Sequence, residues 1–231
     1  MKEQSFSSID QEGIESSNDS ARIETYAFYC YYTLKDYDKA EEYFVKAINL
    51  NPLKAAFVGN YAIFLKNIRK DYDKAEEYYK KAIDLDPEDE RGFGYYAFFL
   101  ENIRKDYDKA EEYYKKALDL NPENAVLVFD YALFLQNIRK DYDKAEEYLI
   151  KAIDLNPENA FYLGFYASFL ENIRKDYDKA EEYYKKALDL NPEDANCYLN
   201  YAIFLKYTRR DFDKAEEYHK KAIDLNPKQT G

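Results

Sequence analysis

The sequence predicts an all-α protein, a solenoid of six antiparallel helical hairpins. The first observation is a period of 35 residues, because the pair Tyr-Ala recurs six times at a constant step from Tyr26 to Tyr201. The second is that all six prolines keep this step, from Pro52 to Pro227. The third is that apolar residues within each copy recur at helical spacings of three and four. Since one such repeat cannot bury its apolar face alone, stacking of neighbouring repeats must supply the core.

The first helix of each copy surrounds the Tyr-Ala pair. In the fourth copy, Tyr131, Ala132 and Leu135 share one face, which predicts a helix over about residues 125–137. The small side chain of Ala132 is expected where two helices approach closely.

The second helix follows the DYDKAEEY segment of each copy. In the fourth copy, either Asp141 or Asp143 suits the N-cap, and Asp143 followed by Glu146 fits a capping box. The helix is expected to end before Pro157, because proline cannot continue the helical hydrogen bonds. The two helices and their short turns make an antiparallel hairpin.

The chain divides into three expected parts. Residues 1–20 are rich in serine and acids and lack periodic apolar residues, which predicts a disordered leader. Residues 21–227 form the repeat array, and residues 228–231 are a polar tail. The expected repeat boundaries are 21–54, 55–89, 90–124, 125–159, 160–194 and 195–227.

The charge balance disfavours nucleic acid and membrane partners. The net charge of −12 repels phosphate backbones and anionic lipid, so an apolar or basic partner is more compatible. Much of the charge belongs to exposed helix faces, such as Glu111 and Glu112 four residues before Lys115 and Lys116. Each such pair stabilises a helix by only about 0.2–0.5 kcal/mol.

The sequence contains no catalytic, cofactor or metal motif. It lacks a glycine-rich phosphate loop, a nucleophile elbow and an HExxH motif, and His219 is the only histidine. Cys30 and Cys197 lie in different repeats, in a pattern that fits neither a disulfide framework nor a zinc site. No apolar run is long enough to cross a membrane. These features predict a non-enzymatic protein without cofactors in the cytoplasm.

The repeated pattern resembles the tetratricopeptide repeat family. Each copy has a small residue and aromatic positions in the first helix, followed by DYDKAxxYxxKAxxLxP or a close variant, and the resemblance covers about residues 21–227. It implies a right-handed superhelix that serves as a non-catalytic protein-interaction scaffold. Two departures from the family are evident. One extra residue stands near the end of the first helix, in xNIRK, and Ala132 and Lys140 occupy positions where the family usually has glycine.

The resemblance also implies a concave groove lined by the first helices. The residues concerned lie two and one before, and two after, the Tyr of each Tyr-Ala pair, where the copies differ from one another. The predicted peptide-binding residues are Asn60, Ile63, Tyr95, Phe98, Phe129, Asp130, Leu133, Phe165, Ser168, Leu199, Asn200 and Ile203. Because these positions contain no Lys or Arg, binding of an acidic C-terminal tail is disfavoured.

Three glycines, Gly59, Gly94 and Gly164, fall at one groove position inside the first helix. Each costs about 1 kcal/mol relative to alanine. Two explanations stay open at this stage. The glycines make room for a ligand, or they allow close contact between neighbouring helices.

The leading functional hypothesis is a scaffold whose groove binds a peptide or helix of a protein partner. The alternative is structural self-association, in which the terminal repeats stack end to end to give a dimer or a head-to-tail fibre. RNA binding is a third hypothesis, because pentatricopeptide proteins also have a 35-residue helical period. The net negative charge and the groove without Lys or Arg argue against it.

Overall fold

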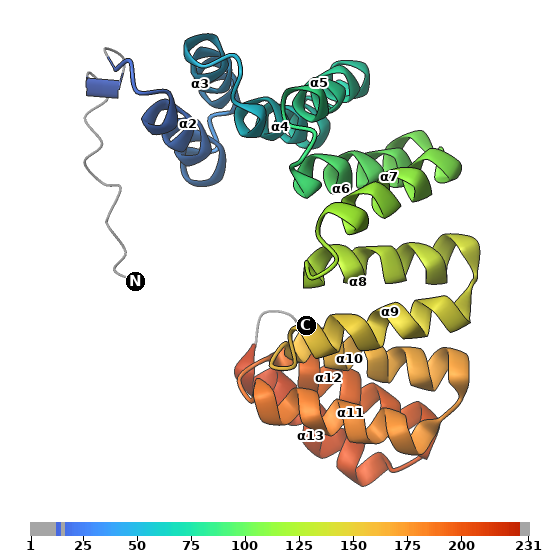
Figure 1. Cartoon of the computed structure of the whole chain (residues 1–231). Coiled ribbons are helices and arrows are strands. Elements are labelled where there is room, and N and C mark those ends of the chain that lie inside the picture. The colour runs from blue at the N-terminus through green and yellow to red at the C-terminus, as the bar shows by residue number, and fades with distance from the viewer. Residues whose placement is uncertain (1–12, 15–16, 227–231) are drawn as a thin grey trace. The chain divides into compact units, whose positions relative to one another are not determined.

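The computed structural model describes residues 13–14 and 17–226 and is all-α, with no strand among these residues (Figure 1). This confirms the predicted array of helical hairpins. The chain separates into two compact units, Met1–Leu120 and Asn121–Gly231. The first unit contains repeats one to three, and the second contains repeats four to six.

Each repeat has the same two α-helices at the same positions. The first helices have ten residues each. They are α2 (Ser20–Tyr29), α4 (Ala55–Phe64), α6 (Glu90–Phe99), α8 (Ala125–Phe134), α10 (Ala160–Phe169) and α12 (Ala195–Phe204). The second helices have fourteen residues each. They are α3 (Tyr37–Leu50), α5 (Tyr72–Leu85), α7 (Tyr107–Leu120), α9 (Tyr142–Leu155), α11 (Tyr177–Leu190) and α13 (Phe212–Leu225).

The core of each unit lies between these helices. Within a repeat the two helices pack along their length, and each second helix also contacts the next first helix of its unit. Ala132 and Ala145 are fully buried, as expected for small residues at close helix contacts. The Tyr of the Tyr-Ala pair is buried as well, and the hydroxyl of Tyr96 donates to Glu76 of the preceding repeat at 3.0 Å.

A π-helical turn ends the first helix of every repeat. In the fourth repeat the α-helix stops at Phe134 and the π-turn covers Leu135–Arg139, so the α-helix is shorter than predicted. A π-turn is how a helix absorbs one additional residue, which places the extra residue of the 35-residue period in this segment, as expected. The turn closes when the amide of Asp141 donates to the carbonyl of Leu135 at 3.1 Å.

A lysine or arginine follows each π-turn in the left-handed conformation. Lys140 has a φ of 58°, and its counterparts in the other repeats have φ between 56° and 61°. This conformation costs an L-residue about 1–2 kcal/mol, and glycine adopts it freely. The family's usual glycine position therefore keeps its backbone geometry here without glycine.

An arginine clamp joins successive repeats within each unit. In the second unit, Arg174 donates to Asp143 and to Glu146 at 2.7 Å each, and it donates to the carbonyl of Tyr142 at 3.1 Å. Equivalent clamps are formed by Arg69, Arg104 and Arg209.

These contacts contradict the predicted capping box. The N-cap of α9 is Asp141, which accepts from the amide of Lys144 at 3.2 Å. Asp143 lies in the first turn and its carboxylate binds the guanidinium of the next repeat, where a charged partner is available.

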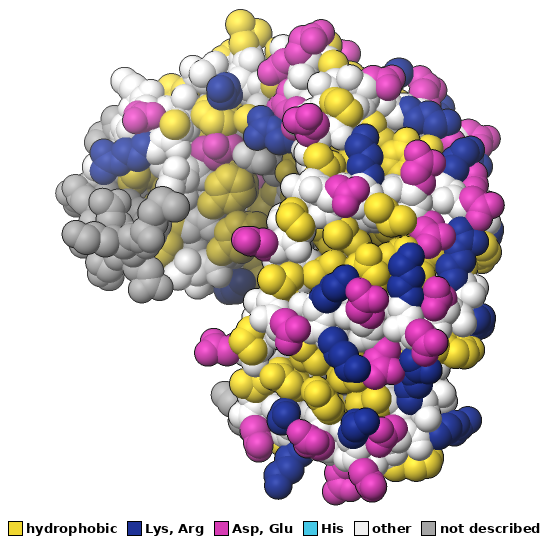
Figure 2. Space-filling model, turned by 60° about the horizontal axis from the view of Figure 1, so that its bottom comes forward, with side chains coloured by type: hydrophobic (Ala, Val, Ile, Leu, Met, Phe, Trp, Pro, Cys, Tyr) yellow, Lys and Arg dark blue, Asp and Glu magenta, His cyan; other side chains and the backbone are white. Residues whose placement is uncertain are grey.

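The remaining surface is charged and mixed in sign. Figure 2 shows Lys and Arg side chains interspersed with Asp and Glu side chains on the face that it draws. The predicted pairs of Glu111 with Lys115 and Glu112 with Lys116 form at 2.6 Å. None of the helices in the described part of the chain has the length and apolar character needed to cross a membrane.

The predicted leader falls largely outside the described residues, and the polar tail falls entirely outside them. Within the expected leader, Asp19 is the N-cap of α2, and its carboxylate accepts from the amides of Ala21 and Arg22. The array therefore begins one residue before the expected boundary, at Ser20.

Candidate functional site

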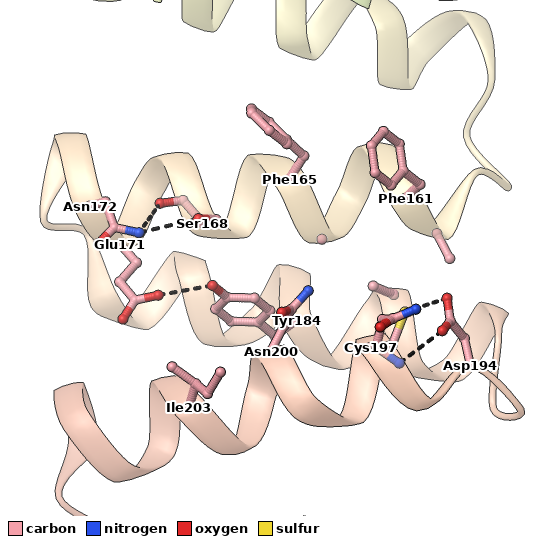
Figure 3. A pocket seen from close by; sticks show the side chains of 14 residues that line it. Phe161, Phe165, Ser168, Glu171, Asn172, Tyr184, Asp194, Cys197, Asn200 and Ile203 are labelled. Carbon is pink, nitrogen blue, oxygen red and sulfur yellow. Dashed lines mark hydrogen bonds between the residues drawn. The ribbon is translucent and has the colours of Figure 1, made fainter. Parts of the chain in front are cut away.

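The second unit contains a cavity of about 320 Å³ between α10 and α12 (Figure 3). These two first helices contact each other, and α11 packs against both. Tyr184 and Ala187 of α11 form the floor of the cavity. The hairpin geometry allows this space, because it places consecutive first helices side by side over the second helix that connects them.

Two aromatic residues of α10, Phe161 and Phe165, border the cavity, with their rings on the side of α10 away from α12 (Figure 3). Phe161 is 64% exposed and Phe165 is partly exposed. Both rings pack on Phe129 of α8, with centroids 5.4 Å and 5.1 Å from it. Phe129 itself is buried and also stacks on Tyr162. The exposed rings are therefore held by a buried aromatic cluster, while Ile203 supplies an exposed apolar side chain on α12.

Two carboxylates lie toward opposite ends of the cavity in Figure 3. Glu171 accepts hydrogen bonds from the hydroxyls of Tyr184, at 2.9 Å, and Thr208. Asp194 is the N-cap of α12 and accepts from the amide of Asn196 at 2.9 Å. These donors are all neutral, and none of the residues that line the cavity is Lys, Arg or His.

Cys197 lies beside Asp194 and donates its thiol to that carboxylate, with a sulfur–oxygen distance of 3.7 Å. Burial and the neighbouring charge of Asp194 raise the pKa of Cys197 to about 11. The thiol is therefore protonated at neutral pH and is a weak nucleophile.

Gly164 faces the floor of the cavity. A methyl group added there would meet the Cβ of Ala187 at 4.0 Å, which is ordinary van der Waals contact. Close helix packing therefore does not require glycine at this position. Of the two explanations for the glycines, the geometry at Gly164 therefore does not support the need for close helix contact.

The first unit has an equivalent but smaller cavity of about 90 Å³ between α4 and α6. Of this equivalent pair, the cavity between α10 and α12 is called the larger cavity and the one between α4 and α6 the smaller cavity. Tyr95 occupies the position that Asn200 has in the second unit, and Asn60 occupies that of Phe165. Arg91 forms an ion pair with Asp89, the counterpart of Asp194, at 2.9 Å. This cavity is partly filled, and its capping carboxylate already has a cation.

The wall behind the smaller cavity is polar. The amide of Asn60 donates to Glu24 of α2 at 2.8 Å, at the positions that Phe165 and Phe129 occupy in the second unit. Burial raises the pKa of the Glu24 carboxyl, although the hydrogen bond from Asn60 opposes that shift.

The structure brings some of the predicted groove residues together and separates others. Phe165, Ser168, Asn200 and Ile203 line the larger cavity, while Asn60 and Tyr95 line the smaller one. Leu199 lines a further cavity, on the last repeat. The other predicted residues line none of these cavities: Ile63, Asp130 and Leu133 are partly buried, Phe98 is exposed beneath the ammonium of Lys66, and Phe129 is buried against Phe161 and Phe165.

Sequence reasoning missed several residues of the larger cavity. Phe161 lies one helical turn before Phe165, and Glu171 lies one turn after Ser168, so an extension of the same helix face would have found both. Tyr184 and Asp194 carried no such signal. The repeat pattern marks Tyr184 as a packing position, and Asp194 as a residue of the turn between repeats.

The fold defines a class: a solenoid of helical hairpins. Family models support this assignment. A model described as TmcB, TPR repeats matches residues 97–162, and models described as tetratricopeptide repeat match residues 29–54, 68–89, 139–195 and 183–217. The chain belongs to the tetratricopeptide repeat family. Proteins of this family are generally non-catalytic scaffolds for protein interactions.

Solved structures of the family are similar to this chain. Yeast Tom70 shares 27% sequence identity, with a TM-score of 0.72 over 94% of this chain and 46% of its own. Pseudomonas aeruginosa pilF shares 22% identity, with a TM-score of 0.71 over 90% of this chain and 92% of its own. YrrB, described as a TPR protein with an unusual peptide-binding site, shares 25% identity, with a TM-score of 0.56 over 80% of this chain and 93% of its own. Curated protein sequences gave no significant match.

Proposed function

We propose that the protein is a scaffold that binds a peptide segment of a protein partner in the cavity between α10 and α12. The observation that carries the proposal is the cavity of about 320 Å³, which is open beside the exposed Phe161 and Ile203. Exposed aromatic and aliphatic side chains around a preformed hollow are typical anchors for a peptide.

Three further facts support this proposal. Four residues predicted from the sequence alone to bind a peptide line this cavity. Gly164 keeps the cavity open although alanine would fit there and would favour the helix. YrrB, whose fold is similar, is described as having a peptide-binding site.

The experiment starts with a random-peptide phage library selected on the full chain. An enriched peptide is then tested against the variant Asn200→Tyr, which gives the cavity the side chain that Tyr95 supplies in the smaller one. Since tyrosine is accommodated at the equivalent position, the fold should be kept. We expect binding to weaken by about tenfold or more, equivalent to about 1.4 kcal/mol.

The matched control is Tyr95→Asn, which opens the smaller cavity and should leave the affinity unchanged. Equal affinity of the wild-type chain and the Asn200→Tyr variant would place the binding site elsewhere. Absence of any enriched peptide would contradict the proposed function itself.

Self-association is a second candidate function, favoured by a cavity of about 400 Å³ on the last repeat. Tyr207 and Phe212 line it and are each 59% exposed. Asp213 and Glu216, the counterparts of the clamp acids in earlier repeats, are also exposed. This face resembles the faces that receive the next repeat elsewhere in the chain, so the first repeat of a second copy is the proposed occupant.

Sedimentation velocity over a concentration series tests this candidate. We expect association that weakens in the variant Phe212→Ser, because the substitution removes exposed apolar area from the contact. A strict monomer at every concentration would contradict it. The first repeat has Leu34 where the other repeats carry the clamp arginine, so such a contact would lack the arginine clamp.

A further inference from the structure

The larger cavity has two carboxylates, Glu171 and Asp194, and no basic side chain among the residues that line it. Glu171 and Asp194 accept only from hydroxyl, thiol and backbone amide donors among the described residues, and no basic side chain lines the cavity. Neutral donors orient the carboxylates and leave their charges in place. A bound group that brings positive charge would gain the electrostatic energy that the cavity lacks.

The smaller cavity shows how the same positions are neutralised within the chain. There, Arg91 forms a two-pronged ion pair with Asp89, through Nε and a terminal nitrogen, each at 2.9 Å. Lys66 stands at the position of Glu171, three repeats earlier. The smaller cavity is therefore lined by a basic residue, Arg91, whereas the larger one is lined by none; Lys66 does not line the smaller cavity, and its ammonium lies over the ring of Phe98.

The apolar part of the larger cavity suits the stem of a basic side chain. Arginine and lysine bury their methylene groups along apolar surface while the charged head stays near polar partners. Phe161 and Phe165 border the cavity on α10, and their rings extend from α10 on the side away from α12 (Figure 3). Ile203 and Ala187 offer aliphatic contacts on the opposite wall and the floor.

We propose that the cavity between α10 and α12 recognises a basic side chain, arginine or lysine, of the bound peptide. This inference rests on the proposed function and specifies its ligand chemistry. Because the carboxylates of Glu171 and Asp194 lie toward opposite ends of the cavity, the charged head meets one of them, with Ala187 and Ile203 against the stem. Asp130, one of the predicted groove residues, does not line this cavity.

The test compares peptides enriched from the phage library with versions in which one basic residue is replaced by citrulline, a neutral isostere of arginine. We expect the citrulline peptide to bind about tenfold more weakly, a factor that corresponds to about 1.4 kcal/mol. The double variant Glu171→Gln, Asp194→Asn should bind both peptides with the same weak affinity. Asparagine caps helices as well as aspartate does, so α12 should be retained.

Glu101→Gln is the matched control. Glu101 lies in an identical sequence segment and accepts from Tyr114 at 2.9 Å, as Glu171 does from Tyr184, so it reports the structural cost of the substitution. It should leave peptide affinity unchanged. Equal affinity for arginine and citrulline peptides would overturn the inference. If Asn200→Tyr still abolished binding in that case, the proposed function would stand, so the two failures are distinguishable.

Discussion

The cavities of the two units occupy the same repeat positions and differ in the side chains that decide their chemistry. Both have a glycine in the first helix, an alanine on the floor and an aspartate at the N-cap of the following first helix. The larger one has Phe161 and Phe165, whereas the smaller one has Ala56 and Asn60. One backbone arrangement thus yields an open, acidic and aromatic hollow in one unit and a small hollow with an internal ion pair in the other.

This difference separates the framework of the repeat from the residues around its cavities. The arginine clamp, the π-turn and the left-handed residue recur in both units with nearly unchanged geometry. The residues around the cavities vary. Substitutions at paired positions therefore test whether a change acts on the framework or on one cavity.

The largest effect is expected from Phe129→Ala. Phe129 is buried in the aromatic cluster behind the larger cavity, so its loss should leave a hole and lower the free energy of unfolding by roughly 3–5 kcal/mol. Glu24→Ala at the equivalent position of the first unit removes one hydrogen bond and should cost about 1 kcal/mol. Urea denaturation measures the free energy of unfolding of both variants. Equal losses of stability would show that the aromatic cluster contributes no more than the single hydrogen bond.

The next effect concerns two buried tyrosines at one repeat position. Tyr184 donates to the carboxylate of Glu171, so Tyr184→Phe should cost about 1.5–3 kcal/mol. The hydroxyl of Tyr79 has no hydrogen-bond partner among the described residues, and Lys66 stands where Glu171 would. Tyr79→Phe should therefore leave stability unchanged or raise it. Thermal melts of the two variants test this. A lower melting temperature of Tyr79→Phe would indicate that the Tyr79 hydroxyl has a hydrogen-bond partner.

A smaller effect is expected from Gly164→Ala. The methyl group fits at 4.0 Å from Ala187, so the variant should gain about 1 kcal/mol of helix stability while binding the selected peptide more weakly. Gly59→Ala, with a contact of 3.7 Å to Ala82, should gain similar stability and keep full affinity. Calorimetric titration with parallel melts checks both. Unchanged affinity of Gly164→Ala would argue against a ligand in the cavity.

The smallest effect is expected from Lys140→Gly and its counterpart Lys70→Gly. Both lysines adopt the left-handed conformation, with φ of 58° and 56°. Glycine relieves that strain but adds entropy to the unfolded chain, which leaves a net gain of about 0.5–1 kcal/mol. The gain should be equal in the two units, as measured by urea denaturation. Unequal gains would show that equal backbone geometry in the two units does not mean equal energetics.

The sequence was sufficient for features that depend on local pattern. Helix positions follow from periodic apolar residues and from proline. The extra residue before Lys140 indicated that the turn there departs from the usual one of the family. Features that depend on neighbouring repeats were less accessible. The acids of DYDKAEEY look like a capping box until the arginine of the next repeat is placed beside them. Phe129 looks like a groove residue until the rings of Phe161 and Phe165 are seen to cover it. The handedness of the superhelix and the disorder of the leader stay predictions.

The arrangement of identical copies has a consequence for the length of the array. Residues 101–123 and 171–193 have the same sequence, and the framework contacts that they make are equivalent. A recombination between these two segments would remove two whole repeats and leave each remaining junction with its π-turn and its acids in phase. It would also place Arg91 and Tyr95 beside α12, where Phe161 and Phe165 now stand. A shortened descendant would therefore keep the repeat framework and acquire different side chains around its cavity in a single step.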